Sequence, residues 1–362
     1  MSYLAGKRIC VSGAGIAGSA FAIAFKNACK VSGTSPPPII EVFEREASPS
    51  AREGVGYSFS LRADNNSGSG GIQVVQQLGI ADELTKLQEP GNLSHICWQD
   101  FKPLIRAPWV PDGQLLADGI LRISRSNLRK VLVSHMPSDI VRWGTACTSA
   151  VPAANAGGKV QLGFADGSTT ECDLLVVADG SSSKLRTSLL PHEPNNYAGV
   201  CMLMGRTEAL PQLPPEATEL NALFRDPQAA QDFRAHGLQQ LAKGFSEPLH
   251  SMINATKTSS LAAWPCMDKL PHPIHGHGVV YLGDAWHPMS PFSGSGANMA
   301  LVDSWELAQQ LVTGGHGSME AAINDANQQW RDQWSVLVRQ SPPATEQHQA
   351  AHVQPKCQAC LL

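Results

Sequence analysis

The sequence predicts an α/β fold of the Rossmann type, with a parallel sheet and a second, smaller α+β domain. Short apolar runs that end in glycine-containing turns are typical of buried parallel strands, whose carboxyl ends bind ligands. Three such runs support the prediction: Arg8 to Ser12 before a glycine-rich turn, Leu174 to Ala178 before Asp179-Gly180, and Val279 to Leu282 before Gly283-Asp284.

Composition describes an ordinary globular chain and excludes several partners. The 362 residues are 43% hydrophobic and 16% charged, which is enough for one to three domains. A net charge of −4 provides no basic field for nucleic acid, and no apolar run is long enough to span a membrane. The start of the chain is similar to a signal peptide, but its glycines favour a strand, a turn and a helix. Nine cysteines without framework spacing predict reduced thiols and a cytoplasmic protein.

The first motif is a dinucleotide-binding turn, Gly13-Ala-Gly15-Ile-Ala-Gly18. Its first glycine permits the bend, the second lets the backbone approach a pyrophosphate, and the third allows close packing of helix on strand. A second strand from Ile39 to Phe43 ends in Glu44, whose carboxylate can bind both ribose hydroxyls. A surface-loop insertion at residues 30 to 38 explains the long spacing between the glycines and Glu44.

The last of the three runs leads into a Gly/Pro/Ser loop and a helix that starts at Ala297. Asp284, at the strand end, can accept hydrogen bonds from ligand hydroxyls, and the helix start favours an anion. The alternative is that Gly283-Asp284 is only a strand-to-turn signal. His287 follows Asp284, and we expect it to be structural; a catalytic pair of the two is the alternative.

Other candidate residues have a plain alternative as well. Arg125 lies near a predicted helix start, where a cation is unusual, so a bound phosphate or an acid would account for it. A solvated surface arginine remains possible there, as it does for Arg45 and Arg52. His272, His275 and His277 have no fitting companions for a metal, and a disordered tail is favoured over a zinc or redox site for Cys357 and Cys360.

Together these motifs resemble the three fingerprints of the FAD-dependent aromatic hydroxylases, which share the para-hydroxybenzoate hydroxylase fold. The resemblance rests on three sets of residues: Gly13-x-Gly15-x-x-Gly18 with Glu44-Arg45, Asp179-Gly180 with Arg186, and Gly283-Asp284-Ala-Trp-His-Pro through Asn298. Their order matches the family, and the last motif most resembles the tetracycline-inactivating and secondary-metabolite monooxygenases. The resemblance covers residues 7 to 205 and 274 to 340.

The resemblance implies roles for individual residues. Glu44 would bind the adenosine ribose, Arg125 would contact FAD through the I-x-R-x-x-L pattern, and Asp284 would bind the ribityl or pyrophosphate side. Where close relatives place an acid near the flavin, this chain has Ser60. No catalytic side chain and no metal ligand is implied. The implied cofactor-binding set is Gly13, Gly15, Gly18, Glu44, Arg45, Arg52, Gly56, Arg125, Asp179, Asp284, Gly296, Ala297 and Asn298.

The resemblance also implies an activity. Such enzymes reduce FAD with NADPH or NADH, form a C4a-hydroperoxyflavin with dioxygen and transfer oxygen to an aromatic or polyketide-like small molecule. No nucleic acid or membrane partner is expected, and the protein is expected to be a monomer or dimer. The alternative is a flavin-binding paralogue without efficient oxygenase turnover, because residues 205 to 270 lack several strands that the family uses as its pocket floor.

The predicted FAD-binding domain is discontinuous and comprises residues 1–90, 120–190 and 275–340. The substrate domain comprises residues 91–119 and 191–274, and is shortened, with a mostly helical stretch from Ala222 to Ile253. Residues 341–362 are predicted to form a disordered tail.

Overall fold

The computed structural model describes residues 2–51, 57–63, 70–88, 93–97, 103–108, 120–204, 262–271, 277–289 and 294–340. Its centre is a five-stranded parallel sheet with the strand order β14-β11-β1-β2-β7. The predicted α/β class is therefore confirmed. The strands are β1 (Arg8–Ser12), β2 (Ile39–Glu44), β7 (Val141–Trp143), β11 (Leu174–Val177) and β14 (Val279–Tyr281).

The strand order creates a topological switch point between β1 and β11. From β1 the chain passes through α1 to β2 on one side, whereas β11 lies on the other side of β1. Ligands of open α/β sheets bind in the crevice outside the carboxyl ends of the strands at such a point. The switch point therefore indicates where a dinucleotide would lie.

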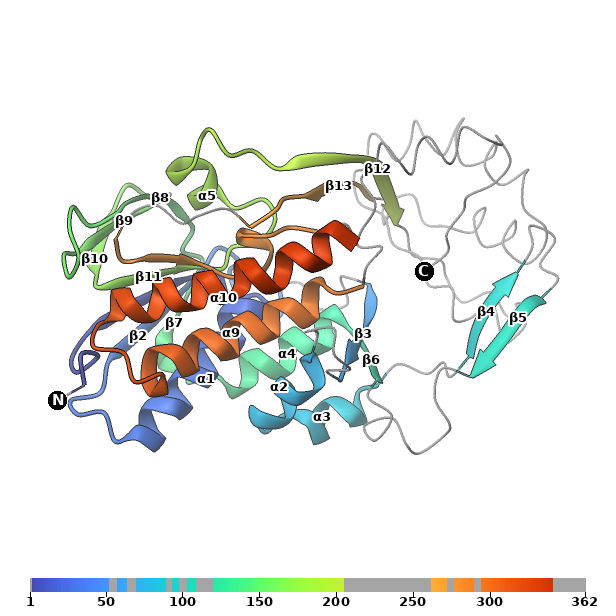
Figure 1. Cartoon of the computed structure of the whole chain (residues 1–362), viewed down its shortest axis with the longest axis horizontal. Helices are drawn as coiled ribbons and strands as arrows, with labels where there is room; N and C mark the ends of the chain where they lie inside the picture. The colour runs from blue at the N-terminus through green and yellow to red at the C-terminus, as the bar shows by residue number, and fades with distance from the viewer. Residues whose placement is uncertain are drawn as a thin grey trace.

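A layer of helices covers one face of this sheet, and Figure 1 shows α9 and α10 side by side in front of it. Helix α9 packs against α1, where the Ser304 hydroxyl donates to the Ala17 carbonyl at 2.9 Å. In α9 the buried residues Leu301, Ser304, Ala308 and Leu311 recur every three or four positions, so they lie on one side of the helix. The helices are α1 (Ile16–Ser32), α2 (Gly71–Gln77), α3 (Ala81–Lys86), α4 (Arg125–His135), α5 (Lys184–Leu189), α9 (Gly296–Thr313) and α10 (Met319–Gln340), with short 3-10 turns η1 (Ser138–Ile140) and η5 (Gly283–Ala285).

The remaining strands are antiparallel. The residues on either side of Ala165-Asp166-Gly167 form a hairpin of β9 (Val160–Phe164) and β10 (Thr169–Cys172), and β8 (Cys147–Val151), which was not predicted, pairs with β9. Three further pairs are β3 (Ser58–Arg62) with β6 (Ile120–Ser124), β4 (Leu93–Cys97) with β5 (Pro103–Pro108), and β12 (Asn196–Met204) with β13 (Ala262–Asp268).

One expectation about a connection needs correction. The surface loop before β2 is shorter than residues 30 to 38, because α1 continues to Ser32 and ends at Gly33 in a left-handed conformation. Within the region 205 to 270 the structure describes β13, which pairs with β12. The expected absence of several family strands there stays a prediction, because residues 205–261 lie outside the described residues. The predicted helical stretch from Ala222 to Ile253 and the predicted tail at 341–362 lie outside the described residues.

Candidate functional site

The glycine turn after β1 has the tight packing that its spacing predicts for the first and third glycines. Gly13 has φ +102°, and a Cβ there would lie 2.6 Å from the Ala178 carbonyl oxygen at the end of β11. A Cβ at Gly18 would lie 1.9 Å from the Gly13 carbonyl oxygen, so α1 packs directly on the turn. A Cβ at Gly15 would meet nothing within 4 Å. The turn is thus tightly packed at both ends and open in its middle.

Glu44 ends β2 beside this turn. Its Oε2 accepts a hydrogen bond from the N–H of Ala14 at 2.7 Å, and its Oε1 accepts one from the N–H of Glu46 at 3.0 Å. The residue is buried, with only 7% exposure. Arg45, by contrast, has a side chain that is 57% exposed and lies 3.8 Å from the Glu46 carboxylate. The structure therefore brings Glu44 to the turn and leaves Arg45 at the surface.

Asp179 and Arg186 connect the ends of β11 and β14. The guanidinium of buried Arg186 donates to the carbonyls of Asp284 at 3.1 Å, Ala285 at 2.9 Å and Ser181 at 2.7 Å. Burial raises the pKa of Asp179, while Ser183 and the positive charge of Arg186 oppose that rise. Oδ1 of Asp179 is buried without a hydrogen-bond partner among the described residues. Arg186 thus fixes the loop that carries Asp284.

Asp284 itself lies beside the start of α9. A Cβ at Gly296, the first residue of this helix, would lie 3.6 Å from Oδ1 of Asp284. The helix begins one residue earlier than predicted, so Ala297 is its second residue. No side chain caps its N-terminus, and the same is true of α1, whereas Ser124 caps α4 and Ser183 caps α5. The backbone N–H groups at the starts of α1 and α9, both predicted to face a ligand, are thus not occupied by a capping side chain.

Asn298 uses its side chain to hold β3 against α9. Its Oδ1 accepts from the N–H of Arg62 at 2.8 Å, and its Nδ2 donates to the carbonyls of Ser60 at 3.0 Å and Gly294 at 3.4 Å. The residue is fully buried. This contact of the Asn298 side chain was not predicted. Ser60, at the position where the resemblance implies an acid, is also buried.

Arg125 is the first residue of α4, as predicted, and its N–H donates to the Tyr57 carbonyl at 2.9 Å. Its side chain is half-buried. Arg52 and Gly56 lie outside the described residues. The structure thus places Arg125 next to the start of β3 and does not describe the other two candidates.

His287 pairs with Asp303 and not with Asp284. Its Nε2 lies 2.7 Å from Oδ2 of Asp303, which also accepts from the N–H of Gly283 at 3.0 Å. Both side chains are almost wholly buried, at 1% and 0% exposure. Burial alone would lower the pKa of His287, but the Asp303 carboxylate outweighs it, so the pKa is raised. The pair supports the turn that carries Asp284.

No metal centre appears among the described residues, which contain no group of three His, Cys, Asp or Glu side chains placed to hold an ion. His277 instead lies 2.9 Å from the Glu320 carboxylate, while His272 and His275 lie outside the described residues. Cys10, Cys29, Cys147, Cys172 and Cys266 are buried thiols that form no disulfide. The part of the chain that the structure describes also holds no helix of the length and apolarity needed to span a membrane.

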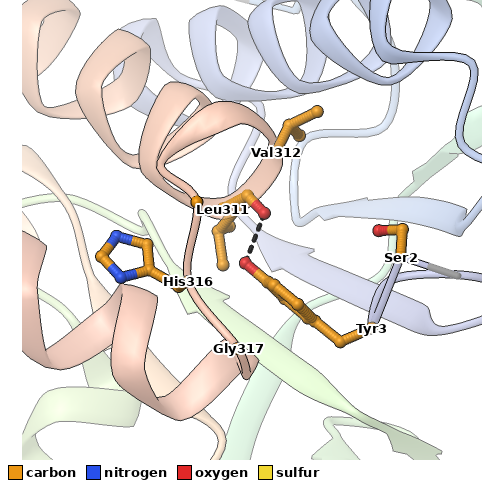
Figure 2. Close-up of a pocket in the computed structure, with 7 residues that line it drawn as sticks. Ser2, Tyr3, Leu311, Val312, His316 and Gly317 are labelled. Carbon is orange, nitrogen blue, oxygen red and sulfur yellow. Dashed lines mark hydrogen bonds between the residues drawn. The ribbon is translucent and has the colours of Figure 1, made fainter.

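A cavity of about 300 Å³ lies at the other end of α9, lined by Ser2, Tyr3, Leu311, Val312, Gly315, His316 and Gly317 (Figure 2). The Tyr3 hydroxyl donates to the Leu311 carbonyl across it. Leu311 is about 22 Å along the helix axis from Gly296, at 1.5 Å per residue. This cavity is therefore separate from the strand ends and the candidate site.

Sequence reasoning missed two residues of the site. Asp303 lies four residues after Met299 and four before Leu307, both buried in α9. A charged residue on the apolar stripe of a helix was the available signal, because such a residue needs a buried partner. Arg129 contacts the glycine turn from α4. Nothing in its local sequence distinguishes it from a surface arginine.

Comparisons with known proteins agree with this geometry. Residues 222–338 match the family described as FAD binding domain. Monooxygenase cfoF of Aspergillus candidus is 28% identical, covering 85% of this chain and 84% of that protein. Salicylate hydroxylase of Pseudomonas putida is 26% identical, covering 84% of this chain and 77% of that protein.

The solved structure of HpxO from Klebsiella pneumoniae with FAD and uric acid has a TM-score of 0.69 to this chain. The two are 22% identical, and the match covers 91% of this chain and 86% of that one. This similarity shows that the fold is shared over nearly the whole length.

Proposed function

We propose that this chain, a member of the FAD-dependent monooxygenases with the para-hydroxybenzoate hydroxylase fold, uses NADPH or NADH to oxygenate an aromatic or polyketide-like small molecule. The observation that carries the proposal is the convergence of separate stretches at one switch point. The turn at Gly13 touches the end of β11, Glu44 binds that turn, and Asp284 lies beside the start of α9.

The residues present fit FAD. Gly15 leaves the middle of the turn open for a pyrophosphate, and the uncapped N-terminus of α1 begins there. Glu44 places a buried carboxylate next to that turn, where ribose hydroxyls would donate to it. The uncapped start of α9 at Gly296 and Ala297 offers backbone donors beside Asp284. Gly13, Gly18, Arg45, Arg125, Asp179 and Asn298 complete the proposed set from the described residues.

When bound, FAD supplies the reductive activation of dioxygen. The chain binds and orients this cofactor and stabilises negative charge with the dipole of α9 at Ala297. Asp284 would hold the hydroxyl-bearing chain between the ring and the phosphates. Oxygen transfer also requires a dry site, which the chain provides by covering the substrate. We assign that task to residues 91–119 and 191–274, and cofactor binding to residues 1–90, 120–190 and 275–340.

Named relatives support an aromatic substrate. They include salicylate hydroxylase and 6-hydroxynicotinate 3-monooxygenase of Pseudomonas fluorescens, the latter 25% identical. We therefore propose a hydroxylated aromatic or heteroaromatic ring as the substrate class. A cytoplasmic location would supply the reduced nicotinamide, and it agrees with buried thiols such as Cys10 and Cys147 that form no disulfide.

The test is anaerobic reduction of the FAD-reconstituted protein by NADPH and by NADH, with salicylate, 6-hydroxynicotinate or no aromatic present. We expect bleaching of the flavin absorbance to accelerate with an aromatic that binds. Readmission of labelled dioxygen should then place one oxygen atom in the product. A yellow protein that none of a broad panel of aromatics accelerates, and that forms no labelled product, would favour the flavin-binding paralogue without turnover.

A further inference from the structure

We propose that Arg129 is a positioning residue for the ADP half of FAD, which deepens the proposed function and rests on it. Arg129 lies on α4, one turn after Arg125, and its Nε donates to the Ala14 carbonyl at 3.0 Å. Ala14 stands between the first two glycines of the dinucleotide turn. The contact spans 115 positions of the sequence and joins α4 directly to the proposed pyrophosphate site.

The same guanidinium holds two more segments around this turn. Its Nη1 donates to the Pro49 carbonyl at 3.0 Å, in the segment that follows Glu44 and β2. The Cζ atom of Arg129 lies 5.7 Å from the ring centroid of Trp143, which is at the end of β7. This distance is within the range of a cation–π contact. One side chain therefore ties together the ends of β1, β2 and β7.

The consequence is that the peptide groups on both sides of Ala14 are fixed. Its N–H donates to the Glu44 carboxylate at 2.7 Å, while its C=O accepts from Arg129. The Ala14 carbonyl belongs to the same peptide plane as the N–H of Gly15, because the peptide bond is planar. Arg129 thus sets the direction of the Gly15 N–H, the donor nearest the open middle of the turn.

Lysine cannot reproduce this arrangement. A guanidinium presents several donors in a rigid plane and stacks on an aromatic ring, whereas an ammonium is a single point charge. Lysine would keep the positive charge near the phosphates but lose the simultaneous contacts to Ala14, Pro49 and Trp143. Arg129→Lys is therefore expected to lie between the parent and Arg129→Met in affinity for the ADP half.

The experiment measures dissociation constants of ADP, FAD and riboflavin for the apoprotein by calorimetry, together with apoprotein thermal unfolding. Arg129→Met should weaken ADP and FAD by roughly ten- to a hundred-fold, the range for loss of charged hydrogen bonds. Riboflavin, which lacks phosphates and adenosine, should bind the variant and the parent alike. The matched control is Lys130→Met, which removes an exposed positive charge from the same helix and should leave all three constants unchanged.

Equal ADP affinity for the parent and Arg129→Met would overturn the proposal, as would a parallel loss of ADP and riboflavin, which indicates a purely structural role. Should Arg129→Met fail to fold, Arg129→Lys and Trp143→Leu decide, since each should weaken ADP without weakening riboflavin. A parent protein that binds no FAD would refute the proposed function itself. That result differs from one in which the parent and Arg129→Met both bind FAD with equal affinity, which would refute only the role of Arg129.

Discussion

Glu306 gives the folded protein a pH dependence that can be worked out from the structure. Its Oε2 accepts a hydrogen bond from Nε1 of Trp330 at 2.6 Å, between α9 and α10. Burial raises the pKa of Glu306 from 4.5 to about 7, with the Trp330 hydrogen bond lowering it and Asp303 raising it. The folded protein therefore holds this proton more tightly than the unfolded chain does.

The sign follows from linkage. Stability falls with pH wherever the folded state binds more protons, which for Glu306 is the window from about 4.5 to about 7. This difference between the folded and unfolded pKa values of Glu306 corresponds to at most about 3 kcal/mol of unfolding free energy. His287 acts in the same direction, because its raised pKa gives a stabilisation present at low pH and lost as pH rises through the folded value.

Glu306→Gln removes the titration and keeps a carbonyl acceptor for Trp330. Urea unfolding of the parent and the variant at pH 5, 6, 7 and 8 measures the difference. We expect the parent and Glu306→Gln to have similar free energies of unfolding at pH 5. At pH 8 the variant should be more stable than the parent by up to about 3 kcal/mol. Glu171→Gln, at an exposed position of β10, is the control and should show no such trend. A difference between Glu306→Gln and the parent that is constant across pH would refute the reasoning.

Three more predictions concern the proposed cofactor site. Glu44→Ala should weaken FAD binding by about 1.5–3 kcal/mol, measured by flavin fluorescence, because a buried carboxylate acceptor is lost; unchanged affinity would exclude ribose binding by Glu44. Asp284→Ala should lower FAD occupancy after purification, whereas retention of full colour would remove Asp284 from the site. Ala297→Pro removes a donor in the first turn of α9, where proline is tolerated, and should lower the potential of bound flavin. An unchanged potential in that variant would reject the role of the helix terminus.

The parts of the fold that depend on local pattern could be predicted from the sequence. Gly13, Gly15 and Gly18 each have the packing or the open space that their spacing requires, because the turn is built by neighbouring residues. The three apolar runs became β1, β11 and β14, since parallel strands buried on both faces need unbroken apolar residues. The Ser183 side chain caps α5 by accepting from the N–H of Arg186, three residues further on. These features are set within a few residues of each other.

Features that depend on distant residues could not be predicted. Asp303 pairs with His287 across 16 positions, and Arg129 reaches Ala14 across 115. Neither partner is specified by the residues around it, since each contact exists only after α9 and α4 have packed. Strand β8 (Cys147–Val151) was missed for a related reason. It is short, most of its residues are small, and it is stabilised by pairing with β9. Long-range packing therefore decides the contacts that support the predicted motifs.

The contact between Asn298 and β3 yields a final prediction, which depends on whether the Nδ2 position of this side chain carries a hydrogen-bond donor. Asn298→Asp keeps the acceptor for the N–H of Arg62 but replaces the donor to the Ser60 and Gly294 carbonyls with a carboxylate oxygen. Because the site is fully buried, the charged form should cost about 3 kcal/mol or more at pH 8, by repulsion and desolvation. Burial should raise the pKa of the new carboxyl, and the protonated form can donate to Ser60 again. Unfolding experiments should therefore show Asn298→Asp regaining stability relative to the parent as pH falls from 8 to 5, whereas Asn298→Ala, which has no titrating group, should show a pH-independent loss. Parallel pH profiles for the two variants would show that the amide's donor is not what holds β3 to α9.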